Sequence, residues 1–283
     1  MNAGDSSGGA RLHQLQHLDQ LIICEGWQEF VSPVDLPQDL KMLNIKKLYL
    51  GTPSINLIGV SITPAFTNTL THLWLTTTDS DSISPYAIVL RYGVNLKSLR
   101  IEGVLVEPSS QHFRRYSHAL PFLTEFGVNH YGAEQDADFF PAVCDFIRLK
   151  ARQLVHLELR TTINKYISDR LGFKECWDMF RSMADRTTAA TSAVSFPQLE
   201  TLSMTLPGAI KNLTLHYSNL IPKSVTSLCL SGNCLSGKSI KQLFKIVSFR
   251  SYRCSILSLS HSDSATNQEK LSQVASEPSQ YFH

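Results

Sequence analysis

Residues 225–235 read VTSLCLSGNCL, a hexad of the form apolar-x-x-apolar-x-apolar that is followed by Asn233 and Leu235. Side chains alternate between the two faces of a β-strand, so Leu228 and Leu230, at the fourth and sixth hexad positions, point the same way. The amide of Asn233 would bond to the backbone of the turn after the strand. The stretch therefore predicts a strand with one buried face, followed by a tight turn.

The same hexad recurs along nearly the whole chain, at LDQLII (18–23), IKKLYL (45–50), LTHLWL (70–75), LKSLRI (96–101), LTEFGV (123–128), LVHLEL (154–159), LETLSM (199–204), IKNLTL (210–215) and CSILSL (254–259). The first steps between starts are 27, 25, 26, 27 and 31 residues, and Leu199 and Val225 are 26 apart. Units of this length with this hexad are typical of leucine-rich repeats. They predict an α/β fold: a ribonuclease-inhibitor-like horseshoe with a parallel sheet on the concave side and helices and irregular connectors on the convex side.

The segments between hexads predict helices in three places, from their apolar spacing: 84–95, 136–151 and 238–249. HFRRYSH (112–118) reads as a solvated basic loop. The 45-residue step from Leu154 to Leu199 holds an insertion at 161–196, with a short helix expected around 176–184. We expect one repeat domain over 15–259 and disordered ends at 1–14 and 260–283.

Composition argues against several functional classes. The net charge is +2, no Lys/Arg run exceeds two residues, and no apolar run approaches 18 residues, so we expect neither nucleic-acid nor membrane partners. His13 and His17 share a helical spacing without a third ligand, and no CxxC, GxSxG or phosphate-binding glycine motif occurs. We therefore expect no enzymatic activity, no cofactor and no metal. The absence of an apolar leader and the cysteine pattern predict reduced thiols and a cytoplasmic or nuclear location.

The third and fifth hexad positions should face away from the core, toward the concave side. The partner-binding residues expected there are Lys47, Tyr49, His72, Trp74, Arg100, Glu125, His156 and Glu158. Tyr, Trp and Arg dominate interface energetics, so the column Tyr49–Trp74–Arg100 predicts protein binding. The basic side chains in this half favour a partner with acidic character. The alternatives are that Trp74 is covered by a loop of this chain, or that the register is off by one.

Five stretches also resemble the repeat region of fungal, basidiomycete-type F-box/leucine-rich-repeat proteins: LTHLWLTTTD (70–79), NLKSLRIEG (95–103), LPFLTEFGV (120–128), FPQLETLSMTLP (196–207) and VTSLCLSGN (225–233). The resemblance covers roughly residues 15–259. It implies the substrate-recognition part of an SCF-type ubiquitin ligase, an adaptor in ubiquitin-dependent protein degradation that works with the cullin-based core. No F-box is recognisable, because the nearest phrase, LPQDL (36–40), runs directly into the hexad at Ile45. The alternative is a non-enzymatic scaffold or sensor repeat domain unrelated to ubiquitination.

Overall fold

The described part of the chain contains one parallel sheet whose strand order follows the sequence. The computed structural model describes residues 19–23, 44–50, 69–77, 85–103, 109–130, 137–161, 176, 179–180, 195–205, 221–231 and 256–260. The nine strands are β1 (Gln20–Ile23), β2 (Lys47–Leu50), β3 (His72–Thr77), β4 (Ser98–Gly103), β5 (Glu125–His130), β6 (His156–Thr161), β7 (Thr201–Thr205), β8 (Ser227–Ser231) and β9 (Ile256–Ser260). The predicted α/β class with an all-parallel sheet is confirmed.

The hexad sets the register of this sheet. Each of the nine strands begins at the third position of a hexad, and each pairs there with the third position of the next strand, as in Lys47↔His72 and His72↔Ser98. Third hexad positions also pair across the 45-residue step from Leu154 to Leu199, because His156 of β6 pairs directly with Thr201 of β7. Thr201 in turn pairs with Ser227, so β7 and β8 are neighbours one period apart. The hexad from Ile210 lies outside the described residues.

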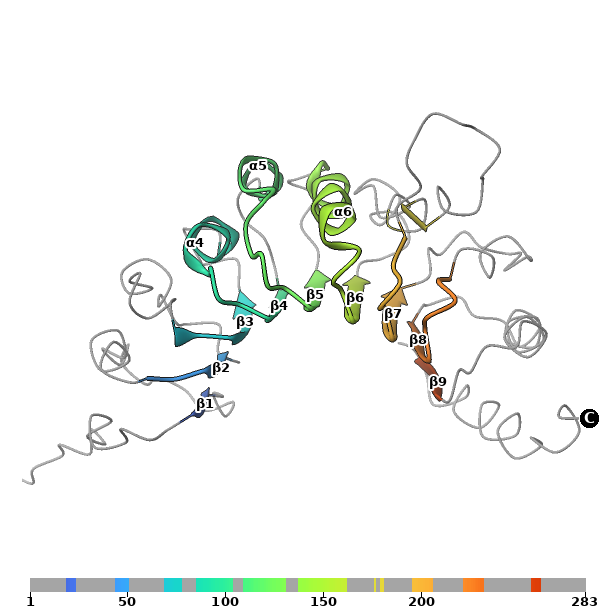
Figure 1. Cartoon of the computed structure of the whole chain (residues 1–283), viewed down its shortest axis with the longest axis horizontal. Helices are drawn as coiled ribbons and strands as arrows, with labels where there is room; N and C mark the ends of the chain where they lie inside the picture. The colour runs from blue at the N-terminus through green and yellow to red at the C-terminus, as the bar shows by residue number, and fades with distance from the viewer. Residues whose placement is uncertain are drawn as a thin grey trace, which may run out of the picture.

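Three helices lie on the outer side of the arc that the strands form (Figure 1). They are α4 (Pro85–Tyr92), α5 (Ser110–Arg115) and α6 (Phe139–Lys150). The predicted helices at 84–95 and 136–151 are thus confirmed as α4 and α6. Apolar residues in the first, fourth and sixth hexad positions face these helices and are almost fully buried, as with Leu96, Leu99 and Ile101.

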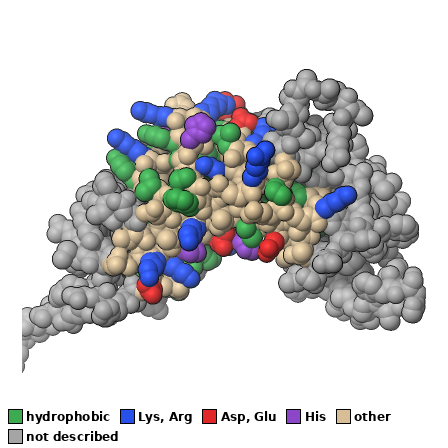
Figure 2. Space-filling model, in the orientation of Figure 1, with side chains coloured by type: hydrophobic (Ala, Val, Ile, Leu, Met, Phe, Trp, Pro, Cys, Tyr) green, Lys and Arg blue, Asp and Glu red, His purple; other side chains and the backbone are tan. Residues whose placement is uncertain are grey.

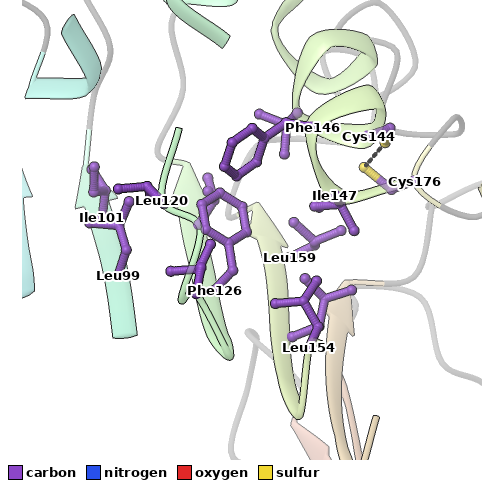
Figure 3. Close-up of a cluster of buried hydrophobic side chains, with 14 of the residues drawn as sticks. Leu99, Ile101, Leu120, Phe126, Cys144, Phe146, Ile147, Leu154, Leu159 and Cys176 are labelled. Carbon is purple, nitrogen blue, oxygen red and sulfur yellow. Dashed lines mark hydrogen bonds between the residues drawn. The ribbon is translucent and has the colours of Figure 1, made fainter. Parts of the chain in front are cut away.

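The centre of the core lies between α6 and strands β4 to β6. Figure 3 shows the rings of Phe126 of β5 and Phe146 of α6 directed toward one another, with centroids 5.7 Å apart. Phe113 of α5 joins them, with its ring centroid 6.3 Å from that of Phe126 and 5.4 Å from that of Phe146. Burying these large aromatic side chains stabilises the fold, since each removes a large apolar area from water.

The prediction of a solvated loop at 112–118 is wrong for its first half. Residues 110–115 form α5, and Phe113 is only 1% exposed. The sequence gives little sign of this helix because its six residues, SQHFRR, contain one large apolar side chain, too few for a helical period to show. Tertiary packing of Phe113 onto the aromatic core therefore decides the conformation.

Other predictions fall largely outside the described residues. These are the helix at 238–249, the disordered N-terminus at 1–14, the C-terminal tail beyond Ser260 and most of the insertion at 161–196. From the expected helix around 176–184 the structure describes Cys176, Met179 and Phe180, all of them buried. The Sγ atoms of Cys176 and of Cys144 in α6 lie 3.6 Å apart (Figure 3).

Candidate functional site

The inner face of the sheet carries the side chains that the hexads turn away from the core. Two parallel sets of residues lie on it. The central column holds the fifth hexad positions: Ile22, Tyr49, Trp74, Arg100, Gly127, Glu158, Ser203 and Cys229. The flanking row holds the third positions, among them Lys47, His72, Ser98, Glu125, His156 and Thr201.

All eight residues expected at the site lie on this face. Tyr49, Trp74, Arg100 and Glu158 are in the central column, and Lys47, His72, Glu125 and His156 are in the flanking row. Along β2, β4 and β6 half-buried and buried residues alternate strictly, as a strand with one face in the core requires. This alternation, together with the pairing of Trp74 with Tyr49 and Arg100, excludes a register shifted by one residue.

The first three members of the central column form an apolar surface. The rings of Tyr49 and Trp74 meet edge to face, with centroids 5.8 Å apart and planes at 71°. Ile22 pairs with Tyr49 on the neighbouring strand, and its side chain is 57% exposed. Tyr49 and Trp74 are half-buried. An isoleucine and two aromatic rings in line on one exposed sheet face are expensive to hydrate.

Trp74 is also held from its other side. The guanidinium carbon of Arg100 lies 4.4 Å from the centre of the indole ring, within the range of a cation–π contact. The indole Nε1 is buried and has no hydrogen-bond partner among the described residues. The ring is therefore fixed by stacking between Tyr49 and Arg100, with no hydrogen bond to orient it.

Four charged residues form the middle of the inner face. Arg100 contacts Glu102 at 2.6 Å and Glu158 at 3.1 Å, and Glu158 contacts Arg160 at 2.9 Å. Arg160 also donates from Nε to Oγ of Ser203 at 2.8 Å. We call Arg100, Glu102, Glu158 and Arg160 the ionic centre. Its two positive and two negative charges cancel, so Arg100 does not give this face the basic character that the sequence suggested.

Gly127 makes the ionic centre possible. It pairs with Arg100 on one side and with Glu158 on the other, so the two partners belong to strands that are not neighbours. A Cβ atom at residue 127 would lie 3.2 Å from Cγ of Arg100 and 3.6 Å from Cβ of Glu158. Because glycine has no side chain, the Arg100 side chain can cross β5 and reach Glu158.

The flanking row carries weaker electrostatic contacts. Oε1 of Glu125 and Nε2 of His156 are 3.9 Å apart and both side chains are partly exposed. Burial lowers the pKa of His72, and Lys47 and Lys97 act in the same direction, while Glu125 opposes them. Nδ1 of His72 lies 2.8 Å from the hydroxyl of Thr71. His72 is therefore neutral at pH 7 and adds no positive charge to the surface.

The eight expected residues leave out three that take part. Ile22 extends the apolar surface, and Glu102 and Arg160 complete the ionic centre. The sequence contained a signal for each. Ile22 is the fifth residue of the first hexad. Glu102 and Arg160 come two residues after the fifth position of their hexads, and therefore lie on the same face of their strands. What the sequence could not show is that Arg100 pairs across a glycine.

The described residues contain no group of three or more His, Cys, Asp or Glu side chains placed to hold a metal ion. No helix in the described part is long and apolar enough to cross a membrane. The inner face carries apolar side chains, ring contacts and oriented ion pairs. No protein-family model matches the chain, and neither the curated proteins nor the solved structures give a match.

Proposed function

We propose that the chain is a leucine-rich-repeat solenoid that binds a protein partner on its inner face. The solenoid assignment is supported by the nine strands that begin at the same hexad position and by the helices on the outer side of the arc (Figure 1). In such a stack each unit contacts only its neighbours, and the inner sheet forms one continuous surface.

The observation that carries the binding proposal is the exposed apolar surface of Ile22, Tyr49 and Trp74 beside the ionic centre. Aromatic side chains lose few rotamers on binding and bury a large area, so they are common anchors of interfaces. The ionic centre next to them is neutral and already paired. It therefore supplies fixed hydrogen-bonding groups that select a partner rather than a net charge that attracts one.

These properties indicate the chemistry expected of the partner's surface. It presents apolar or aromatic side chains to Ile22, Tyr49 and Trp74, and polar groups to the rim of the ionic centre. Removing one such aromatic anchor from an interface costs about 2 kcal/mol, which is roughly a 30-fold loss of affinity.

The experiment is affinity purification of the tagged chain followed by mass spectrometry. We expect a protein that the wild-type chain recovers and that the Tyr49→Ala/Trp74→Ala variant loses. Phe122→Ala is the control, because it removes an aromatic ring that is 59% exposed and lies outside the inner face. If the double variant retains every protein that the wild type recovers, the inner face is not the binding site.

The sequence resemblance supports a narrower proposal, that the bound protein is a substrate of a cullin-based ubiquitin ligase. The same purification tests it separately. Recovery of the cullin core by both the wild type and the Tyr49→Ala/Trp74→Ala variant would support a substrate adaptor, since the core would attach outside the inner face. A partner recovered without any ligase component would leave the docking proposal standing and remove the ubiquitin link.

A further inference from the structure

One edge of the sheet is formed by the last residues of each helix and the turn that leads from it into the next strand. These connections, counted with the helix ends, are residues 91–97 before β4, 115–124 before β5 and 148–155 before β6. The strands they enter begin at the same level, because Ser98 pairs with Glu125 and Glu125 with His156. We call these three segments together the connection edge. It is distinct from the inner face.

Each of the three connections exposes one large apolar side chain. Val94 is 46% exposed, Phe122 is 59% exposed and Leu149 is 55% exposed. The only other large apolar side chain with comparable exposure in the described part of the chain is Ile22, on the inner face. Each of the three connections thus carries one exposed apolar side chain, although the three lie at different distances before their hexads.

The same connections are strongly cationic. None of the three segments contains Asp or Glu, and four exposed basic residues, Arg91, Lys97, Arg115 and Arg152, have no ion-pair partner among the described residues. Figure 2 shows Lys, Arg and apolar side chains together over α4 to α6, with acidic side chains next to some of the basic ones at the top of the view. The net charge of +2 conceals this because acidic residues elsewhere balance it.

The turn that presents Phe122 is held in place by the neighbouring connection. Leu120 is the only described residue other than glycine with a positive φ, at 54°, a conformation that is strained for leucine. Nε2 of Gln153 donates to the carbonyl oxygens of Pro121 and Leu123, at 3.1 and 2.8 Å. The backbone on both sides of Phe122 is therefore fixed, and the ring is held outward.

We propose that the connection edge binds the surface of an anionic phospholipid bilayer. Arg148 is paired with Asp145 at 2.6 Å, but the exposed cations Arg91, Lys97, Arg115 and Arg152 have no carboxylate partner among the described residues. Apolar side chains that project among such cations match the boundary between acyl chains and acidic headgroups. Binding there leaves the inner face open to its partner.

The test is co-sedimentation of the full chain with vesicles. The chain partitions onto vesicles that contain phosphatidylserine and not onto phosphatidylcholine alone, and high salt releases it. Arg91→Gln/Lys97→Gln lowers partitioning roughly 30-fold, at about fivefold per cation. Phe122→Ala lowers it by about tenfold, since the ring no longer enters the boundary. Circular dichroism checks that each variant is folded.

Ile22→Ala/Lys47→Gln is the matched control, because it removes one exposed apolar side chain and one charge from the inner face. It partitions like the wild type. Equal partitioning onto both kinds of vesicle, or Phe122→Ala and Arg91→Gln/Lys97→Gln variants that partition like the wild type, would overturn the proposal. Binding to soluble poly-glutamate without binding to vesicles would also overturn it, and would assign the edge to an acidic protein.

Discussion

Arg100 and Glu158 form a 3.1 Å ion pair although a whole strand, β5, lies between the strands that carry them. Neighbouring strands are about 4.8 Å apart, so this pair spans roughly twice that distance across the sheet. The missing side chain at Gly127 gives it room, since a Cβ atom there would lie 3.2 Å from Cγ of Arg100. The ionic centre therefore depends on a residue that carries no charge.

Gly127→Leu is expected to separate this pair and to lower the free energy of unfolding by about 1–3 kcal/mol, because the new side chain displaces Arg100. The measurement is a double-mutant cycle with Arg100→Gln and Glu158→Gln, followed by urea denaturation. The coupling should be about 0.5–1 kcal/mol in the wild-type background and vanish in the Gly127→Leu background. Persistence of the coupling in the leucine variant would show that Arg100 reaches Glu158 by another path.

Tyr86→Phe is expected to leave the protein equally stable or to stabilise it by up to about 1 kcal/mol. The Tyr86 side chain is fully buried between the rings of Phe113 and Phe139, and its hydroxyl has no hydrogen-bond partner within the described residues. Removing an unpaired buried hydroxyl ends its desolvation penalty and keeps the ring contacts. Thermal unfolding of the two proteins is the measurement, and a clear loss of stability in the variant would reveal a partner for the hydroxyl.

Tyr86 also predicts that the folded state loses stability at alkaline pH. Burial raises the pKa of Tyr86 well above its ordinary value of 10.0. The folded state therefore keeps the phenol protonated while the unfolded state ionises, so stability falls as the pH rises above about 10. Tyr86→Phe should remove part of this fall and show no pH-dependent difference from the wild type at neutral pH. Identical alkaline profiles for both proteins would contradict the prediction.

His72 predicts that the folded state loses stability as the pH falls. Its pKa is lowered by burial from 6.5, so the folded state holds it neutral while the unfolded state takes up a proton. This contribution to stability is complete above pH 6.5 and is lost as the pH falls below it. His72→Gln should weaken the loss of stability between pH 7 and pH 5, measured by denaturation at each pH. A variant with the wild-type pH profile would show that His72 is not responsible.

Phe113→Ala is expected to cost about 3–5 kcal/mol, because it leaves a cavity where α5 meets the aromatic core. Phe122→Ala in the following connection serves as the control and should change stability by less than about 0.5 kcal/mol, since that ring is 59% exposed. Similar effects of the two substitutions on urea denaturation would mean that α5 contributes nothing to the core.

Much of the fold follows from local sequence because the hexad is a local signal. Every strand begins where the hexads place it, and the faces of Tyr49 and Trp74 follow from alternation alone. The predictions that were wrong concern features that depend on contacts between units. The helix α5 exists because Phe113 packs against residues of three other elements. The positive charge of Arg100 is balanced by carboxylates on its own strand and two strands away. A pattern within one repeat carries no information about such neighbours.

The direct pairing of His156 with Thr201 has a practical consequence for protein engineering. The chain takes 45 residues between Leu154 and Leu199, yet it enters β7 at the same register as after steps of 25–27 residues. The strand register therefore tolerates a long step between hexads. Residues 181–194, which leave out the buried Cys176, Met179 and Phe180, are the place to test the insertion of a reporter or a foreign binding loop.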